Sequence, residues 1–104
     1  MLEPFDFSTP EILDWELELI HRALDQKNIE ITFHALDAAS DDDISPVSLL
    51  EAILVGLPVS KDLPENNLQQ VPGLDFEHRL SDGRWIRVKI AWFGQYTIVT
   101  AHQI

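Results

Sequence analysis

The chain has 104 residues, of which 45% are apolar, and it contains no cysteine. This length and composition suit one domain with one hydrophobic core, and they exclude a disordered chain, a disulfide scaffold and thiol chemistry. Eighteen acidic residues against seven lysines and arginines give a net charge of −11, which opposes contact with nucleic acid or an anionic membrane. No apolar run could span a bilayer and the first residues are acidic, so we expect a soluble, cytoplasmic protein.

The charge is unevenly distributed along the chain. Residues 1–78 contain three cations and seventeen carboxylates, whereas residues 79–104 contain four cations and a single carboxylate. Such asymmetry indicates either that the two parts pack together and compensate each other, or that the acidic part meets a basic partner.

The first half of the chain has helical periodicity. Ser8-Thr9-Pro10-Glu11 is typical of a helix start, and apolar residues at spacings of three and four predict an amphipathic helix over residues 10–26. Alternation over residues 29–33 predicts a strand, followed by a short helix over residues 34–40. Ser45-Pro46 predicts the start of a further helix that ends at Gly56, with an apolar face that includes Val47, Leu50, Ile53 and Leu54.

The second half is typical of antiparallel strands. Residues 57–73 are rich in proline and predict mostly loop, with a short strand near Val59. Alternation on both sides of the Ser81-Asp82-Gly83 turn predicts a hairpin of residues 74–80 and 84–93, and a last strand is expected over residues 96–102. The register that keeps the faces apart pairs Phe76 with Val88, Glu77 with Arg87 and Asp75 with Lys89.

These elements predict an α+β fold, with two or three helices packed on an antiparallel sheet that ends in a three-stranded meander. We expect one domain over residues 1–104, in which residues 1–28 form a lead-in and helix and residues 29–104 form the α+β core. The expected buried residues are Leu13, Leu17, Ile20, Ile31, Phe33, Leu50, Ile53, Phe76, Ile86, Val88 and Ile90. Trp85, Trp92 and Phe93 are most simply core aromatics, although Trp85 falls on the polar face of its strand.

Three segments in order resemble a known family. They are Ile31-Thr32-Phe33-His34-Ala35, then Ile44-Ser45 followed by a helix ending at Gly56, and finally Ser81 to Val88 followed by Thr97-Ile98-Val99-Thr100. Together they resemble the bacterial family known as domain of unknown function 4258. The resemblance implies a fold similar to the RelE, ParE and BrnT toxins and, with it, the activity of an endoribonuclease of a toxin–antitoxin module.

The resemblance also implies candidate catalytic residues. His34 matches the His-Ala motif of the family and could orient a phosphate or transfer a proton, or simply bind a backbone carbonyl at the start of its helix. Arg84 matches the Gly-Arg motif and could clamp a phosphate, or pair with Asp82 or the acidic helices. Arg87 and His102, with Arg79 nearby, could form an anion site, although Glu77 opposite Arg87 favours a plain ion pair.

The chain departs from the family where a ribonuclease needs cations. Residues 36–43 are acidic where the family carries basic residues, and Arg87 stands where the family tends to have histidine. A ribonuclease must hold RNA and stabilise the charge that develops at the phosphate, and cations are scarce here. The sequence contains no phosphate-binding loop, serine nucleophile motif or metal-spaced histidines, so we expect no metal and no cofactor.

Two functions of different classes remain open. One is a toxin-like endoribonuclease. The other, which the acidity favours, is a non-catalytic immunity protein, inhibitor or regulator that masks a protein partner with a basic surface. The expected partner-binding residues are Asp37, Asp41, Asp42, Asp43 and Trp85. Binding of nucleic acid or membrane is not expected, and the sequence leaves the oligomeric state open, including a homo-oligomer.

Overall fold

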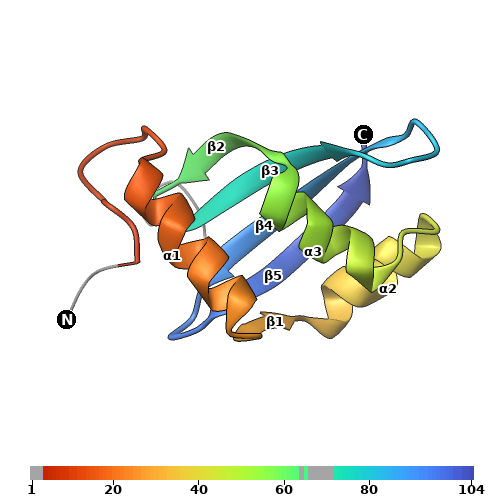
Figure 1. Cartoon of the computed structure of the whole chain (residues 1–104), viewed down its shortest axis with the longest axis horizontal. Helices are drawn as coiled ribbons and strands as arrows, with labels where there is room; N and C mark the ends of the chain where they lie inside the picture. The colour runs from red at the N-terminus through yellow and green to blue at the C-terminus, as the bar shows by residue number, and fades with distance from the viewer. Residues whose placement is uncertain (1–3, 64, 66–71) are drawn as a thin grey trace.

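A computed structural model describes residues 4–63, 65 and 72–104 of the chain. The three helices and five strands are, in chain order, α1 (Asp14–Asp25), β1 (Ile29–Ile31), α2 (Phe33–Asp41), α3 (Pro46–Val55), β2 (Leu57–Asp62), β3 (Gly73–Arg79), β4 (Trp85–Trp92) and β5 (Tyr96–Gln103) (Figure 1). The α+β class and the C-terminal meander are therefore confirmed.

The five strands form one mixed sheet in the order β1-β5-β4-β3-β2. β2, β3, β4 and β5 are antiparallel neighbours, and β1 pairs in parallel with β5, from Ile29 opposite Tyr96 to Ile31 opposite Ile98. A purely antiparallel sheet was expected, so the orientation of β1 is a difference from the prediction. Between β1 and β2, α2 and α3 carry the chain from one edge of the sheet to the opposite edge.

The expected register of the β3–β4 hairpin is confirmed. Leu74 pairs with Ile90, Phe76 with Val88 and Glu77 with Arg87. The Ser81-Asp82-Gly83 turn is closed by the Leu80 amide, which donates to the Arg84 carbonyl at 2.7 Å. Gly83 has a φ of 95°, which a glycine adopts without strain.

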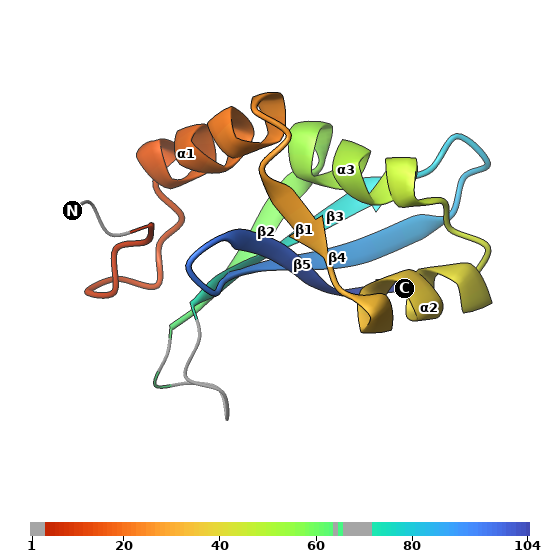
Figure 2. The same cartoon turned by 90° about the horizontal axis from the view of Figure 1, so that it is seen from below.

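α1 and α3 cover one face of the sheet, and α2, which follows β1 in the chain, lies beside β5 (Figure 2). Among the described residues, no helix lies across the opposite face, which we call the open face. The core is between the sheet and the α1–α3 layer. Of the expected core residues, six are buried: Ile20, Ile53, Phe76, Ile86, Val88 and Ile90.

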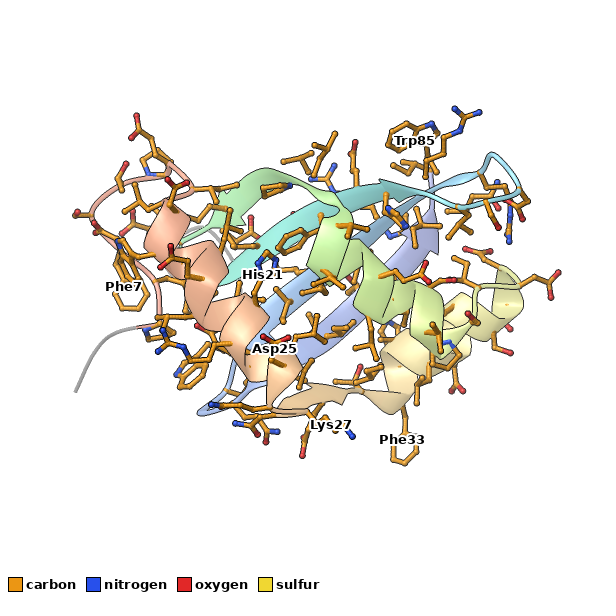
Figure 3. All side chains as sticks on the ribbon, in the orientation of Figure 1. Phe7, His21, Asp25, Lys27, Phe33 and Trp85 are labelled. Carbon is orange, nitrogen blue, oxygen red and sulfur yellow. The ribbon has the colours of Figure 1, made fainter. Side chains whose placement is uncertain are left out.

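The other expected core residues are less buried. Leu17, Ile31 and Leu50 are partly buried against the core, and Leu13 is half-buried. The expectation for Phe33 is wrong, because its side chain is 86% exposed. Phe33 begins α2 instead of ending β1, so it leaves the alternation of the strand, and Figure 3 shows it projecting away from the body of the molecule.

The expected start of the first helix is also wrong. α1 begins at Asp14, and Ser8 and Thr9 make local hydrogen bonds to Asp6 and Glu11 outside it. The carboxylate of Glu16 satisfies the helix start instead, since Oε1 accepts from the Leu13 amide and Oε2 accepts from the Asp6 amide, each at 2.8 Å. Phe5, in the lead-in, is 1% exposed and packs edge-on against Tyr96.

The Glu16 carboxylate is itself buried beside a cation from β2. Lys61 Nζ lies 2.7 Å from Glu16 Oε2 and donates to the Glu11 carbonyl at 2.9 Å. Both side chains are almost completely buried. This pair ties the lead-in and α1 to β2. The expected short strand near Val59 is confirmed, and it is a six-residue edge strand with a bulge between Pro58 and Ser60.

The expected boundaries of α3 are confirmed, but part of its expected apolar face is wrong. Ser45 Oγ accepts from the Ser48 amide, and a Cβ at Gly56 would lie 2.3 Å from the Ala52 carbonyl oxygen. The helix buries Leu49, Ala52 and Ile53 against the sheet. Val47 and Leu54, expected on the buried face, are 63% and 50% exposed.

Candidate functional site

His34 lies in the first turn of α2, where the chain leaves β1. Its exposed side chain borders a shallow hollow of about 470 Å³ on the β1–β5 edge, which Glu30, Phe93 and Val99 also line. Thr32 Oγ1 caps the helix by accepting from the Ala35 amide at 3.0 Å. The side chains that line this hollow include a carboxylate and no lysine or arginine, so they offer little to hold a phosphate.

Arg84 is held by the protein itself. Its Nε donates to Asp82 Oδ2 at 2.9 Å, Nη2 donates to the Asp43 carbonyl at 2.9 Å, and Nη1 donates to the Asp42 carbonyl. The Arg84 hydrogen bonds hold the pKa of Asp82 below its ordinary value of 3.8. The guanidinium thus joins the turn after α2 to the β3–β4 turn. This contact is the expected alternative in which Arg84 pairs with Asp82.

Arg87 lies at the centre of the open face. Its Nη1 lies 3.3 Å from Glu77 Oε2, and its Nη2 lies 3.3 Å from Asp75 Oδ2 and 3.1 Å from Ser60 Oγ. Ser60 in turn donates to Asp75 Oδ2 at 2.9 Å. The expected pair of Arg87 and Glu77 is therefore present, and it is part of a network that reaches across three strands.

Lys89 lies opposite Asp75 in the β3–β4 register, as expected, but its ion pair is with Asp62 of β2 instead of Asp75. The difference arises because Asp75 is taken by Arg87, and because β2 adds a strand that the sequence did not indicate clearly. His102 lies opposite Arg87 on β5, and Arg79 lies opposite Trp85 at the end of β3. Both His102 and Arg79 are exposed.

The candidate catalytic residues are not brought into one cleft. His34 lines the hollow at the β1–β5 edge, whereas Arg84 lines a different hollow between the turns that follow α2 and β3. Arg87 is bound to two carboxylates on the open face. In the described part of the chain, no group of three or more histidines, cysteines and carboxylates is arranged to hold a metal ion.

The acidic residues at the end of α2 have a different character. Asp37, Asp41 and Asp43 are exposed, and within the described residues none of them has an ion-pair partner. Asp42 is only partly exposed, and its Oδ2 accepts a hydrogen bond from the Gln103 amide at 3.1 Å. Carboxylates at the C-terminal end of a helix face the negative end of its dipole, so their electrostatic interaction with the helix is unfavourable.

The backbone at the end of α2 is also unusual. The Ile44 amide donates to the Ala39 carbonyl at 2.8 Å, and Asp43 adopts a φ of 55°. Glycine is the usual residue at this position of a helix end, because other residues are strained there. An aspartate therefore occupies a position where its backbone and its charge are both unfavourable.

The aromatic residues are more exposed than expected. Trp85 and Phe93 are 43% and 54% exposed, so the expectation that they belong to the core is wrong. Both lie at the ends of β4, where little of the sheet surrounds them, and Figure 3 shows Trp85 beside the end of the chain, far from Phe33. Trp92 does pack inward, edge-on against Tyr96 at 4.9 Å between ring centres. Burial, with a smaller effect of Glu16, raises the pKa of Tyr96 to about 12.

Comparison with family models, with curated proteins and with solved structures finds no match. No helix among the described residues is long and apolar enough to cross a membrane.

Proposed function

We propose that this protein is a small acidic binding or regulatory protein, of the immunity, inhibitor or regulator type, that acts on a protein partner with a basic surface. The observation that carries the proposal is how the cations are used. Lys61, Arg84, Arg87 and Lys89 are each held by carboxylates of the chain itself. The cations with no carboxylate partner among the described residues are Arg22, Lys27 and Arg79.

The carboxylates are used differently. Asp37 in the middle of α2 and Asp41 and Asp43 at its end are exposed without ion-pair partners in the described structure, and so are Asp14, Glu18 and Asp25 on α1. A net charge of −11, with four of the seven lysines and arginines already bound to carboxylates, attracts basic proteins and repels nucleic acid. Cytoplasmic action and the resemblance to toxin-like folds are compatible with this role, since inhibitors act where their targets do.

A pair of binding experiments tests the proposal. The tagged protein is used to capture partners from extracts of its source, in parallel with Asp37→Asn/Asp41→Asn and with the control Asp14→Asn/Asp25→Asn, which removes the same charge from α1. We expect a basic protein that the wild type and the control capture and that the α2 variant loses. Loss in neither variant would contradict the α2 carboxylates as the contact.

The alternative, an endoribonuclease, is tested by fluorescence anisotropy with labelled RNA at about 150 mM salt, where surface charges are well screened. We expect no binding at micromolar concentration and no growth arrest when the protein is expressed alone, because few cations are available to phosphates. Micromolar binding that is lost in His34→Ala/Arg84→Ala would overturn the proposal in favour of the ribonuclease.

A further inference from the structure

The outer side of α3 carries apolar residues that no other part of the described structure covers. Val47, Leu54 and Val55 are 63%, 50% and 65% exposed, and we call these three residues the α3 ridge. Residues seven apart on a helix lie on the same side, so Val47 and Leu54 align along the axis, and Val55 lies about 100° around the helix from Leu54. The buried residues Leu49, Ala52 and Ile53 lie on the opposite side of the helix.

A helix that is apolar on both sides is typical of one that is covered on both sides. One side of α3 is covered by the sheet, and Figure 1 shows the helix as the outermost layer over β3 and β4. Exposed apolar side chains grouped on one side of a helix of a small protein are typical of a site of interaction. The α3 ridge is therefore suited to contact with apolar side chains of a partner.

The surroundings of the ridge define the charge of that partner. Glu51 lies on the same side of α3, between Val47 and Leu54, and its carboxylate has a single weak partner, His78, at 3.8 Å. Val47 and Glu51 also line a hollow of about 360 Å³ between the α2–α3 turn and the β3–β4 turn. Its other walls include Asp43, Asp82, Ser45 and Ser48.

This hollow is negatively charged although it contains Arg84. The Arg84 guanidinium is already bound to Asp82 and to the carbonyls of Asp42 and Asp43, so it leaves the carboxylates of Asp43 and Glu51 without a strong partner. Carboxylates and serine hydroxyls around one hollow are groups that accept hydrogen bonds from a lysine or arginine side chain. The same charge opposes a second copy of this chain, with its own net charge of −11, and an anionic membrane surface.

We propose that the α3 ridge and this hollow are the docking surface for a basic amphipathic helix of the partner. The apolar side of that helix packs on Val47, Leu54 and Val55, and a lysine or arginine at one end enters the hollow between Asp43 and Glu51. This inference rests on the proposed function, and it names the surface and the kind of segment that the partner presents. It adds an apolar contact on α3 to the contact made by the α2 carboxylates.

The test measures binding of synthetic peptides to the full chain by fluorescence anisotropy at about 150 mM salt. The first peptide is an amphipathic helix of leucine and lysine, the second has the same composition in scrambled order, and the third replaces lysine by glutamate. We expect the first to bind at least about tenfold more tightly than either of the others, because it alone combines an apolar side with positive charge.

Two variants locate the contact. Leu54→Gln/Val55→Thr should weaken the first peptide by at least about tenfold, and Glu51→Gln should weaken it less while reducing its dependence on salt. Phe33→Gln, which removes an exposed apolar side chain at the far end of α2, is the matched control and should bind as the wild type does. Circular dichroism and urea unfolding confirm that each variant is folded.

Other outcomes overturn the inference in distinguishable ways. Equal binding of the scrambled peptide, or no effect of Leu54→Gln/Val55→Thr, would show that charge alone is recognised, and this would leave the proposed function standing without the ridge. A wild type that is dimeric in sedimentation, with a monomeric Leu54→Gln/Val55→Thr variant, would assign the ridge to a second copy. Micromolar RNA binding would remove the proposed function and this inference together.

Discussion

Around β2 every cation lies against a carboxylate of the chain, whereas around the α2–α3 turn carboxylates and apolar side chains remain without partners in the described structure. In the first region Lys61 is buried against Glu16, and Lys89 and Arg87 bind Asp62 and Asp75. In the second region Asp43 is exposed beside the α3 ridge. The first region therefore serves the fold, whereas the second region is where we propose that a partner binds.

The largest effect is expected from breaking the buried pair of the first region. Lys61→Met removes the cation and leaves the Glu16 carboxylate buried without it, which typically costs about 3–5 kcal/mol in the free energy of unfolding. Urea denaturation measures this cost. Lys27→Met is the matched control, because Lys27 is exposed and has no carboxylate partner among the described residues. A cost below about 1 kcal/mol for Lys61→Met would mean that this region does not depend on the pair.

In the second region we expect a substitution that raises the free energy of unfolding. Asp43→Gly should stabilise the protein by about 1 kcal/mol, because glycine accepts the φ of 55° and because the change removes a negative charge from the end of α2. Thermal unfolding shows the gain, and Asp43→Asn separates the contribution of the charge from that of the backbone. The same Asp43→Gly variant should bind the basic amphipathic peptide more weakly. A loss of stability would contradict the view that Asp43 is retained for contact with a partner.

The smallest effect on stability is expected at the α3 ridge. Leu54→Gln should change the free energy of unfolding by no more than about 0.5 kcal/mol, because its side chain is half exposed and leaves no cavity. Leu49→Ala on the buried side of the same helix should cost about 2–5 kcal/mol. Urea denaturation of the two variants compares the two sides of one helix directly. Similar costs for both would show that the ridge supports the fold.

The parts of the fold that could be predicted from the sequence depend on local patterns. The alternation around Ser81-Asp82-Gly83 was enough to give the register of β3 and β4, because a slip of one residue would have exposed Phe76 and Val88. The start of α1 could not be predicted in this way, since it depends on Glu16, whose partner Lys61 lies far along the chain. β1 has three residues, too few for a pattern to indicate its direction.

The same limit applies to the candidate site. The contact of Arg84 with Asp82 was foreseen because both residues flank one turn. The partner of Lys89 was not, because Asp62 lies in a proline-rich segment whose sequence indicates loop more than strand. Val47 and Leu54 were expected on one apolar face with Leu50 and Ile53, because α3 is apolar on two sides and periodicity cannot show which of them faces the sheet.

The parallel pairing of β1 with β5 has a consequence for the order of events during synthesis. Ile29 to Ile31 leave the ribosome early, but the strand that they pair with is the last element of the chain. β2, β3 and β4 can form their hairpins as they emerge, whereas β1 must wait until Tyr96 to Ile98 are free of the ribosome. The sheet therefore closes at β1 last, and a chain stalled before β5 would have an incomplete sheet and exposed core residues.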